Sequence, residues 1–317
     1  MEAKSNFLFL PSISSARSRS KPRAAPQSFR NLTPSPKKAL SSLLPYSPTE
    51  SVPKPIHLIP PYISAKAWGI FQPNTGEMLY GSKFDEKREI ASLTKIMTCI
   101  YSIKLAGELN ISYSNKITIS KKSAETTGTT AKLKQKDEIM LKDLFYGLML
   151  PSGNDAAVAL AEYFGGLKNE GPPISQFVKG MNEFAQELNL ENTYFKNPHG
   201  LSIKPNFSTV RDVCKLASYA LKNDFFCSVV NTKSYSCLIE NTDSGDRKVT
   251  WKSTNKLLGK GFDGIKTGHT YKAGPCLCVR TKTSEPQLIV TVLGCKSYES
   301  RWSEVPKLAT WAKKKLV

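Results

Sequence analysis

The sequence has few of the residues from which metal and phosphate sites are usually built. It contains three histidines and seven cysteines in 317 residues, and no two cysteines have the C-x-x-C spacing. Zinc sites need clustered thiolates and imidazoles, so we predict no metal site and no cofactor. No Gly-rich phosphate loop, recognition helix or aromatic-basic RNA motif occurs, so nucleic acid is not an expected partner. We expect most thiols to be reduced core residues.

Long apolar runs are also missing, and acidic residues are almost absent from the first 50 residues. No stretch of 18 apolar residues occurs, so we predict no transmembrane helix. From Ala3 to Thr49 the chain has no Asp or Glu, whereas Ser, Pro, Arg and Lys dominate. Residues 1–55 are therefore predicted to be a disordered basic leader. It resembles an organelle transit peptide more than a secretory signal, and an ordinary tail is a third interpretation, so the compartment stays unknown.

The remaining chain, residues 56–317, has the apolar patterns of one folded domain. The net charge of +19 suits an anionic partner or simple solubility. Expected strands are 65–71, 77–82, 234–239, 248–251, 273–281 and 287–294, and expected helices are 92–106, 141–150, 154–164, 174–188, one opening at 208–209, and 303–316. A mostly antiparallel sheet built from both chain ends, with a helical insertion between them, accounts for this order. The fold class is therefore α+β.

A serine and a lysine stand three residues apart in Ala91–Thr98, just before an apolar run. If this stretch opens a helix, Ser92 and Lys95 share one face and their side chains can touch. A serine hydroxyl needs a base within hydrogen-bond reach, and a lysine in a dry, cationic pocket can lose its proton near neutral pH. For this motif alone, a helix cap beside a solvated lysine is the simpler interpretation.

The segment Pro151–Asp155 interrupts two apolar helices, and Asn154 or Asp155 is the expected N-cap of the second. Unpaired polar groups in a buried loop are costly. Ser152 is therefore a candidate proton relay and Asn154 a candidate ligand contact, and a plain helix-helix turn is the alternative.

The segment Gly264–Thr270 is expected to be a loop that leads into a strand, where its polar residues line the rim of a cleft. There Lys266 would supply charge, the Thr267 hydroxyl would bind a carboxylate, and Gly268 would let a ligand backbone approach closely. A loop with no further role is the alternative.

Taken together, S-x-x-K, S-x-N and K-T-G in this order are far more specific than each motif alone. With Asn197–Leu201 (N-P-H-G-L), they resemble the low-molecular-mass D-alanyl-D-alanine carboxypeptidases, which are penicillin-binding serine peptidases of family S11. The resemblance runs from about residue 60 to the C-terminus. It implies a β-lactamase/transpeptidase-like fold for the catalytic domain.

The resemblance also implies a reaction, the removal of the last D-alanine from peptidoglycan stem peptides through an acyl-enzyme, with β-lactams as covalent inhibitors. Ser92 would attack the carbonyl, Lys95 would take its proton, and Ser152 would relay that proton to the leaving amine. Asn154 would bind the acyl side, and Lys266 would hold the local field positive. The other implied groups are the oxyanion-hole amides of Ser92 and His269 and the carboxylate-binding residues Thr267, Gly268 and Arg301.

Several alternatives remain at this stage. The alternative to a carboxylate-binding role for Arg301 is a surface arginine that caps the last helix. A β-lactamase of the same fold would need a carboxylate such as Glu187, which instead continues a predicted helix. Two further functions are possible alternatives. One is a catalytically silent peptidoglycan- or penicillin-binding protein, and the other is an unrelated basic binding protein. Because the sequence ends at Val317, we expect no C-terminal amphipathic anchor.

Overall fold

The structure is a computed structural model that describes residues 59–167, 170–282 and 285–316. The chain divides into two units, residues 1–55 and 56–317, and the described residues all belong to the second. The predicted disordered leader lies outside the described residues.

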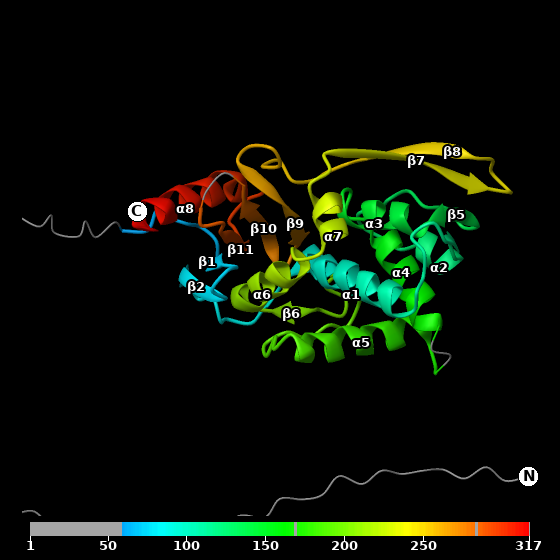
Figure 1. Ribbon diagram of the computed structural model, residues 1–317, viewed down its shortest axis with the longest axis horizontal. Helices are drawn as coiled ribbons and strands as arrows, with labels where there is room; N and C mark the ends of the chain where they lie inside the picture. Colours follow the sequence, from blue (N-terminus) through cyan, green and yellow to red (C-terminus); the bar gives the residue numbers. More distant parts are fainter. Residues whose placement is uncertain (1–58, 168–169, 283–284, 317) are drawn as a thin grey trace, which may run out of the picture. The chain divides into compact units, whose positions relative to one another are not determined.

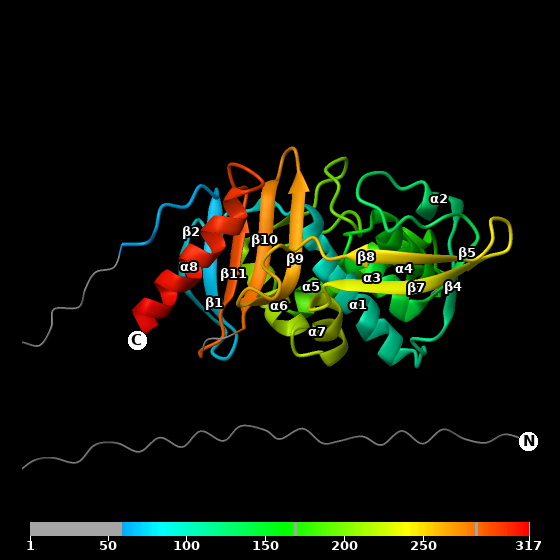
Figure 2. The same ribbon diagram turned by 90° about the horizontal axis from the view of Figure 1, so that it is seen from above.

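Five antiparallel strands form the main sheet, in the order β2-β1-β11-β10-β9 (Figures 1 and 2). Their bounds are Ala67–Gln72 for β1, Glu77–Ser82 for β2, Phe262–Thr270 for β9, Gly274–Thr281 for β10 and Ile289–Leu293 for β11. The two chain ends meet where β1 pairs with β11, with Gly69 opposite Thr291. The predicted sheet from both chain ends is therefore confirmed, and β9 lies at one edge of it.

Helices cover both faces of this sheet. Helix α8 (Ser300–Leu316) packs on one face, and α6 (Val210–Ala220) packs on the other (Figure 2). Alternate residues of β10 therefore enter different cores, since Leu277 packs with the α8 side and Cys278 with the α6 side. Burial on both faces explains why these strands have nearly continuous apolar sequences.

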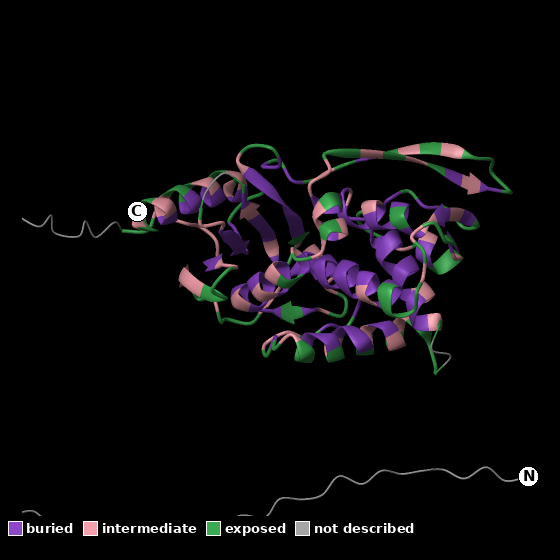
Figure 3. Ribbon diagram, viewed as in Figure 1, coloured by how far each residue is buried: buried purple, intermediate pink, exposed green. Residues whose placement is uncertain are grey.

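The helical insertion surrounds one central helix, α1 (Thr94–Glu108) (Figure 1). Of its 15 residues 12 are buried, and the helices around it turn their buried faces inward (Figure 3). The other helices of the insertion are α2 (Lys121–Ala124), α3 (Leu141–Met149), α4 (Asn154–Gly166), α5 (Pro173–Glu187) and α7 (Asp224–Val230). Polar residues on the buried faces of α1, such as Lys95, are therefore removed from water.

Two features of the insertion differ from the sequence prediction. The predicted pair β7 (Ser234–Asn241) and β8 (Arg247–Lys252) is present, but it extends into a four-stranded sheet with β5 (Asp137–Met140) and β4 (Lys116–Thr118). Strands were also expected directly after Asn223, which is wrong. There the Asn223 side chain accepts a hydrogen bond from the Phe226 backbone amide at 2.8 Å, and this cap starts α7.

Two remaining predictions concern membranes and cysteines. In the part of the chain that the structure describes, no helix is both long enough and apolar enough to cross a membrane. All seven cysteines are free thiols and five of them are buried, as expected.

Candidate active site

Ser92 lies on a short 3-10 turn, η1 (Ala91–Leu93), immediately before α1. Ala91 adopts a left-handed conformation with φ of 47°, and the Thr94 hydroxyl donates a hydrogen bond to its carbonyl at 2.8 Å. Non-glycine residues in this region are strained and occur often at functional sites. The turn leaves Ser92 half-buried at the start of the most buried helix of the fold.

The side chain of Lys95 contacts Ser92 and is fully buried. Its Nζ donates to Ser92 Oγ at 3.1 Å, to Asn154 Oδ1 at 2.7 Å and to the His199 carbonyl at 2.8 Å. Burial, and then the positive charge of Lys266, hold the pKa of Lys95 well below its usual range, against a smaller opposing effect of Asp155. The predicted contact between serine and base is thus present, and burial disfavours the charged form of the base.

The turn between α3 and α4 supplies the second motif. Ser152 has a left-handed φ of 65° and is 4% exposed, and no described residue forms a hydrogen bond with its hydroxyl. The Asn154 amide connects two segments, because its Oδ1 accepts from Lys95 and its Nδ2 donates to the Thr127 carbonyl at 2.7 Å. The predicted capping role of Asn154 or Asp155 is wrong, since Gly153 is the N-cap and has no side-chain cap.

The third motif is part of edge strand β9 and is not the loop that we predicted. Lys266 is 2% exposed, and its Nζ donates to the Thr267 carbonyl at 3.1 Å. Burial and the charge of Arg301 lower the pKa of Lys266 to about 7. A Cβ on Gly268 would lie 3.0 Å from the Ile90 carbonyl oxygen. The glycine therefore lets β9 lie directly against the segment that carries Ser92.

Arg301 completes the far end of the site. Its Nη1 donates to the Gly268 carbonyl at 3.0 Å and to the Cys276 carbonyl at 3.2 Å, and the residue is only 8% exposed. The alternative of a surface arginine that caps the last helix is therefore wrong. Next to it, the Tyr298 hydroxyl lies 2.6 Å from His269 Nδ1, so the end of β9 is held at its rim.

Seven of the nine predicted site residues line one cleft of about 440 Å³, and the two lysines lie buried beneath its floor. The seven are Ser92, Ser152, Asn154, Thr267, Gly268, His269 and Arg301. A hydroxyl beside a desolvated amine, with cationic groups opposite, is the arrangement that acyl transfer needs.

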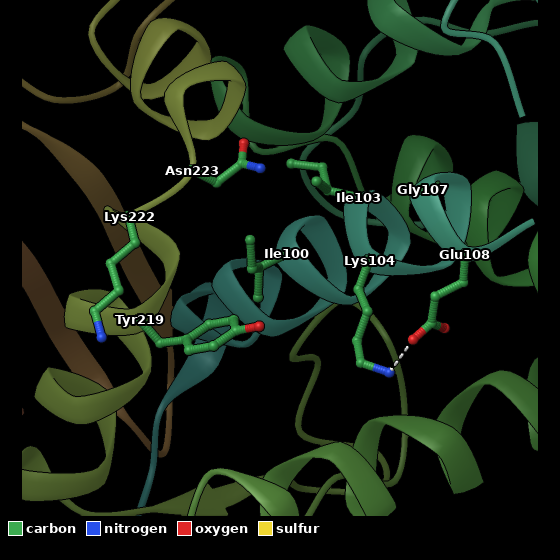
Figure 4. A pocket seen from close by; sticks show the side chains of 8 residues that line it. All are labelled: Ile100, Ile103, Lys104, Gly107, Glu108, Tyr219, Lys222 and Asn223. Atoms are coloured by element: carbon green, nitrogen blue, oxygen red, sulfur yellow. Dashed lines mark hydrogen bonds and ion pairs between the residues drawn. The ribbon is translucent and has the colours of Figure 1, made fainter. Parts of the chain in front are cut away.

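Another hollow, of about 470 Å³, lies between α1, the end of α6 and the residues that lead into α7 (Figure 4). Its floor includes Ile103, and at its rim Lys104 Nζ lies 2.6 Å from Glu108 Oε1. The hydrogen bond with Glu108 raises the pKa of Lys104, so this lysine of α1 remains a cation. None of the three motifs contributes a residue to the lining of this hollow.

Comparison with known proteins agrees with this geometry. A model of the family "D-alanyl-D-alanine carboxypeptidase" (Peptidase S11) matches residues 54–297. The chain belongs to this family. The chain has the β-lactamase/transpeptidase fold, a mixed α and β architecture, and residues of all three motifs line one cleft in it.

Two relatives and one solved structure illustrate the match. The chain is 34% identical to the D-alanyl-D-alanine carboxypeptidase DacF of Bacillus subtilis over 250 residues, 78% of this chain and 62% of that protein. It is 36% identical to a D-alanyl-D-alanine carboxypeptidase of a Streptomyces species over 258 residues, 79% of this chain and 88% of that protein. The crystal structure of the Streptomyces K15 DD-transpeptidase matches with a TM-score of 0.73 and 34% identity, over 80% of this chain and 98% of that one.

Sequence reasoning assigned no role to three residues of the site. The His199 carbonyl accepts from Lys95, the Thr254 hydroxyl lies 2.8 Å from that of Thr267, and Tyr298 lies on the rim. A signal existed only for His199, in the segment N-P-H-G-L that resembles the family. A Cβ on Gly200 would lie 2.0 Å from the Ala91 carbonyl oxygen, so this segment packs directly against η1.

The His199 side chain is neutral. Burial, together with the charge of Lys95, lowers the pKa of His199 to about 3. Its Nδ1 accepts a hydrogen bond from the Leu201 backbone amide at 3.1 Å, which requires an unprotonated nitrogen.

Proposed function

We propose that the protein is a serine-type D-Ala-D-Ala carboxypeptidase that removes the terminal D-alanine of peptidoglycan stem peptides and is acylated by penicillins. One observation supports this proposal most strongly, the 3.1 Å hydrogen bond that joins the fully buried Lys95 Nζ to the half-buried Ser92 Oγ. Membership of the S11 family names the reaction class.

In this proposal acylation begins with neutral Lys95. The amine takes the proton of Ser92 while Oγ attacks the carbonyl between the two D-alanines. The backbone amides of Ser92 and His269 stabilise the oxyanion, an interaction worth about 3–4 kcal/mol when one such donor is removed elsewhere. Ser152 passes the proton to the departing nitrogen as the C–N bond breaks, so the products are an ester on Ser92 and free D-alanine.

Deacylation reverses the roles. Water attacks the ester, Lys95 takes a proton from that water, and Ser92 leaves with a proton returned to its oxygen. A β-lactam undergoes the same first step, but its leaving amine stays attached to the acyl group. The terminal carboxylate of the substrate would lie near Thr267 and Arg301, where buried cationic groups favour an anion.

The β-lactamase alternative needs a carboxylate that activates the deacylating water. Glu187 is the last residue of α5, its side chain is 59% exposed, and its carboxylate lies 4.0 Å from Lys104 Nζ. It lines a different hollow from Ser92, so it cannot serve that water. The geometry therefore favours a penicillin-acylated enzyme that deacylates slowly.

Labelling with a fluorescent penicillin tests the proposal. We expect covalent labelling of the wild type, no labelling of Ser92→Ala, and normal labelling of the control Ser303→Ala, whose residue is exposed on α8. Release of D-alanine from a diacyl-D-Ala-D-Ala peptide is expected in parallel. Labelling that persists in Ser92→Ala would disprove the nucleophile, and labelling without D-alanine release would favour the silent binding protein.

A further inference from the structure

Asp155 is a buried carboxylate to which the proposed mechanism assigns no role. It follows Asn154 on α4 and is fully buried. None of the described residues that line the catalytic cleft is Asp or Glu, whereas Arg301 lines it and two lysines lie buried beneath its floor. Asp155 thus brings a negative charge to a site whose other charged groups are cationic, and this charge acts on Lys95.

Four hydrogen bonds hold the carboxylate of Asp155. Its Oδ1 accepts from the backbone amides of Ala131 and Ala156, both at 2.9 Å. Its Oδ2 accepts from the Thr130 hydroxyl at 2.5 Å and from the Leu133 amide at 3.1 Å. Backbone amides can only donate, so this position requires an acceptor at both oxygens. Three of the four donors belong to one short segment, and Asp155 therefore fixes the path of that segment.

The same segment holds the turn that carries the second motif. The Thr129 hydroxyl donates to the Ser152 carbonyl at 2.6 Å, and the Thr129 carbonyl accepts from the Asn154 backbone amide at 2.7 Å. The Thr127 carbonyl accepts from the Asn154 side chain at 2.7 Å. Asp155 anchors one end of this segment, and the other end binds the backbone of Ser152 and the side chain of Asn154.

The conformation of Ser152 needs support of this kind. Its left-handed φ of 65° is strained, and no described residue forms a hydrogen bond with its hydroxyl. The side chain of Ser152 therefore does not hold the turn in place by itself. The hydrogen bond from Thr129 to the Ser152 carbonyl contributes to the conformation from which this serine reaches a leaving amine.

The charge of Asp155 acts on the base as well. The titratable groups that face Lys95 in the described chain are Asp155 from α4, Lys266 from β9 and His199 from the N-P-H-G-L segment, and His199 is neutral. Burial and then the charge of Lys266 lower the pKa of Lys95, and the charge of Asp155 raises it by a smaller amount. Removal of this charge would therefore move proton uptake by Lys95 to lower pH.

We propose that Asp155 is a positioning residue for acyl transfer: its carboxylate anchors residues 127–133 against the turn that carries Ser152 and Asn154, and its negative charge balances the buried lysines. This inference rests on the proposed carboxypeptidase function. It adds a residue that touches no substrate but determines where the proton relay lies and at which pH the base works.

Rates of acylation by a penicillin, measured with the full chain between about pH 5 and 10, test both effects. Asp155→Asn keeps an acceptor for Ala131 and Ala156, but it carries no charge, and its amide group meets the Leu133 amide donor to donor. We expect acylation to slow about ten- to a hundredfold, because a small displacement of a reacting group is costly. The rising limb of the pH–rate profile should also move to lower pH by about one unit, the lower end of the effect of a neighbouring opposite charge.

Two further variants disturb the geometry and keep the charge. Asp155→Glu adds a methylene group in a buried position, so acylation should slow while the rising limb stays at the wild-type pH. Thr129→Val removes the hydrogen bond to the Ser152 carbonyl and should slow acylation about two- to tenfold, the worth of one hydrogen bond, again with an unchanged limb.

The matched control is Asp212→Asn on α6. Asp212 is 2% exposed, and its carboxylate also accepts from a backbone amide and a threonine hydroxyl, those of Asn192 and Thr193. It does not line the cleft. Its loss of charge should leave both the rate of acylation and the pH–rate profile as in the wild type.

The outcomes distinguish this inference from the proposed function. A wild-type rising limb in Asp155→Asn would overturn the role of the charge, and wild-type rates in Asp155→Asn and Thr129→Val would overturn the positioning role. Circular dichroism checks the folding of each variant. If Asp155→Asn is unfolded, Thr129→Val decides, and a wild-type rate in it would overturn the proposal. A wild type that is not acylated and releases no D-alanine would instead overturn the proposed function.

Discussion

The two walls of the cleft are both polar, but they are held in different ways. On the helical wall, Lys95 Nζ donates to three oxygens between 2.7 and 3.1 Å, and one of them, Asn154 Oδ1, belongs to an amide that is itself anchored at Thr127. On the strand wall, Lys266 Nζ has one hydrogen bond to the neighbouring Thr267 carbonyl and a longer contact of 3.5 Å to the Thr267 hydroxyl.

This difference indicates what each wall does. A proton can move from Ser92 to Lys95 on the helical wall without a large rearrangement, because the two side chains are already hydrogen-bonded. The strand wall holds an ammonium with few partners, so an incoming carboxylate can gain a charge-assisted bond there. Burial lowers the pKa of both lysines, and the charge of Lys266 lowers that of Lys95 further still.

The strongest test of the helical wall replaces its base. Lys95→Ala should slow acylation by penicillin by about ten-thousandfold, the upper range for loss of a general base. Lys95→Arg should be almost as slow, because a guanidinium keeps its proton at all accessible pH values. Stopped-flow acylation kinetics give the rates, and Lys104→Met, on the exposed side of the same helix, is the control. A Lys95→Arg enzyme with near-normal rates would show that the group acts as a charge and not as a base.

The next test replaces the cation of the strand wall. Lys266→Met should slow acylation about a hundred- to thousandfold, as for loss of a transition-state donor. Since the charge of Lys266 lowers the pKa of Lys95, its loss should also move the rising limb of the pH–rate profile to higher pH.

Lys266→Arg keeps the charge and serves as the matched control. The pKa of Lys266 is about 7, so in the wild type a falling limb should begin as this lysine loses its proton. Arginine does not lose its proton there, and the falling limb should disappear. If Lys266→Met leaves the rising limb in place, the two walls are not coupled through charge.

The sequence contained more information about the helical wall than about the strand wall. S-x-x-K has the i, i+3 spacing that brings two side chains of a helix together, and S-x-N marks the break between two apolar helices. Their order along the chain, together with K-T-G, indicates what these side chains can do. The strands β10 and β11 were predictable because burial on both faces requires long apolar runs. Strand β9 was not, because its polar residues face a cleft and do not alternate with apolar ones.

Other features depend on atoms or contacts that leave no trace in residue types. The His199 group that binds Lys95 is a backbone carbonyl, which every residue possesses. The hydroxyl pair Thr254–Thr267 forms only when two segments fold together. Helix α7 has a β-prone sequence, and tertiary packing with the Asn223 cap overrides that preference.

A smaller change tests how closely β9 must approach η1 for acylation. In Gly268→Ala the added methyl group would lie 3.0 Å from the Ile90 carbonyl oxygen and 3.3 Å from Ala91 Cβ, so β9 has to move away from η1. Overpacking of this kind costs about 1–3 kcal/mol, and we expect acylation to slow about ten- to a hundredfold. Gly107→Ala is the control, because nothing lies within 4 Å of its Cβ position. Unchanged acylation in Gly268→Ala would mean that the oxyanion site tolerates a wider gap.

The last test concerns the acid stability of the helical wall. His199 has a pKa of about 3 in the folded protein against 6.5 for an ordinary histidine, so below pH 6.5 the unfolded chain binds a proton that the folded chain does not. The contribution of His199 to the free energy of unfolding is therefore complete above pH 6.5 and falls by about 1.4 kcal/mol at pH 5.5. His199→Asn can keep the acceptor for the Leu201 amide but cannot titrate.

Urea unfolding of both proteins at pH 7.5 and 5.5 measures this contribution. All other titrating groups are shared, so the difference between the two pH-induced losses isolates His199, and the wild type should lose about 1.4 kcal/mol more than the variant. Equal losses would mean that the folded protein accepts this proton, and that water reaches the wall on which Lys95 depends. A greater loss in the wild type would instead support the dry environment that keeps the amine of Lys95 available as a base.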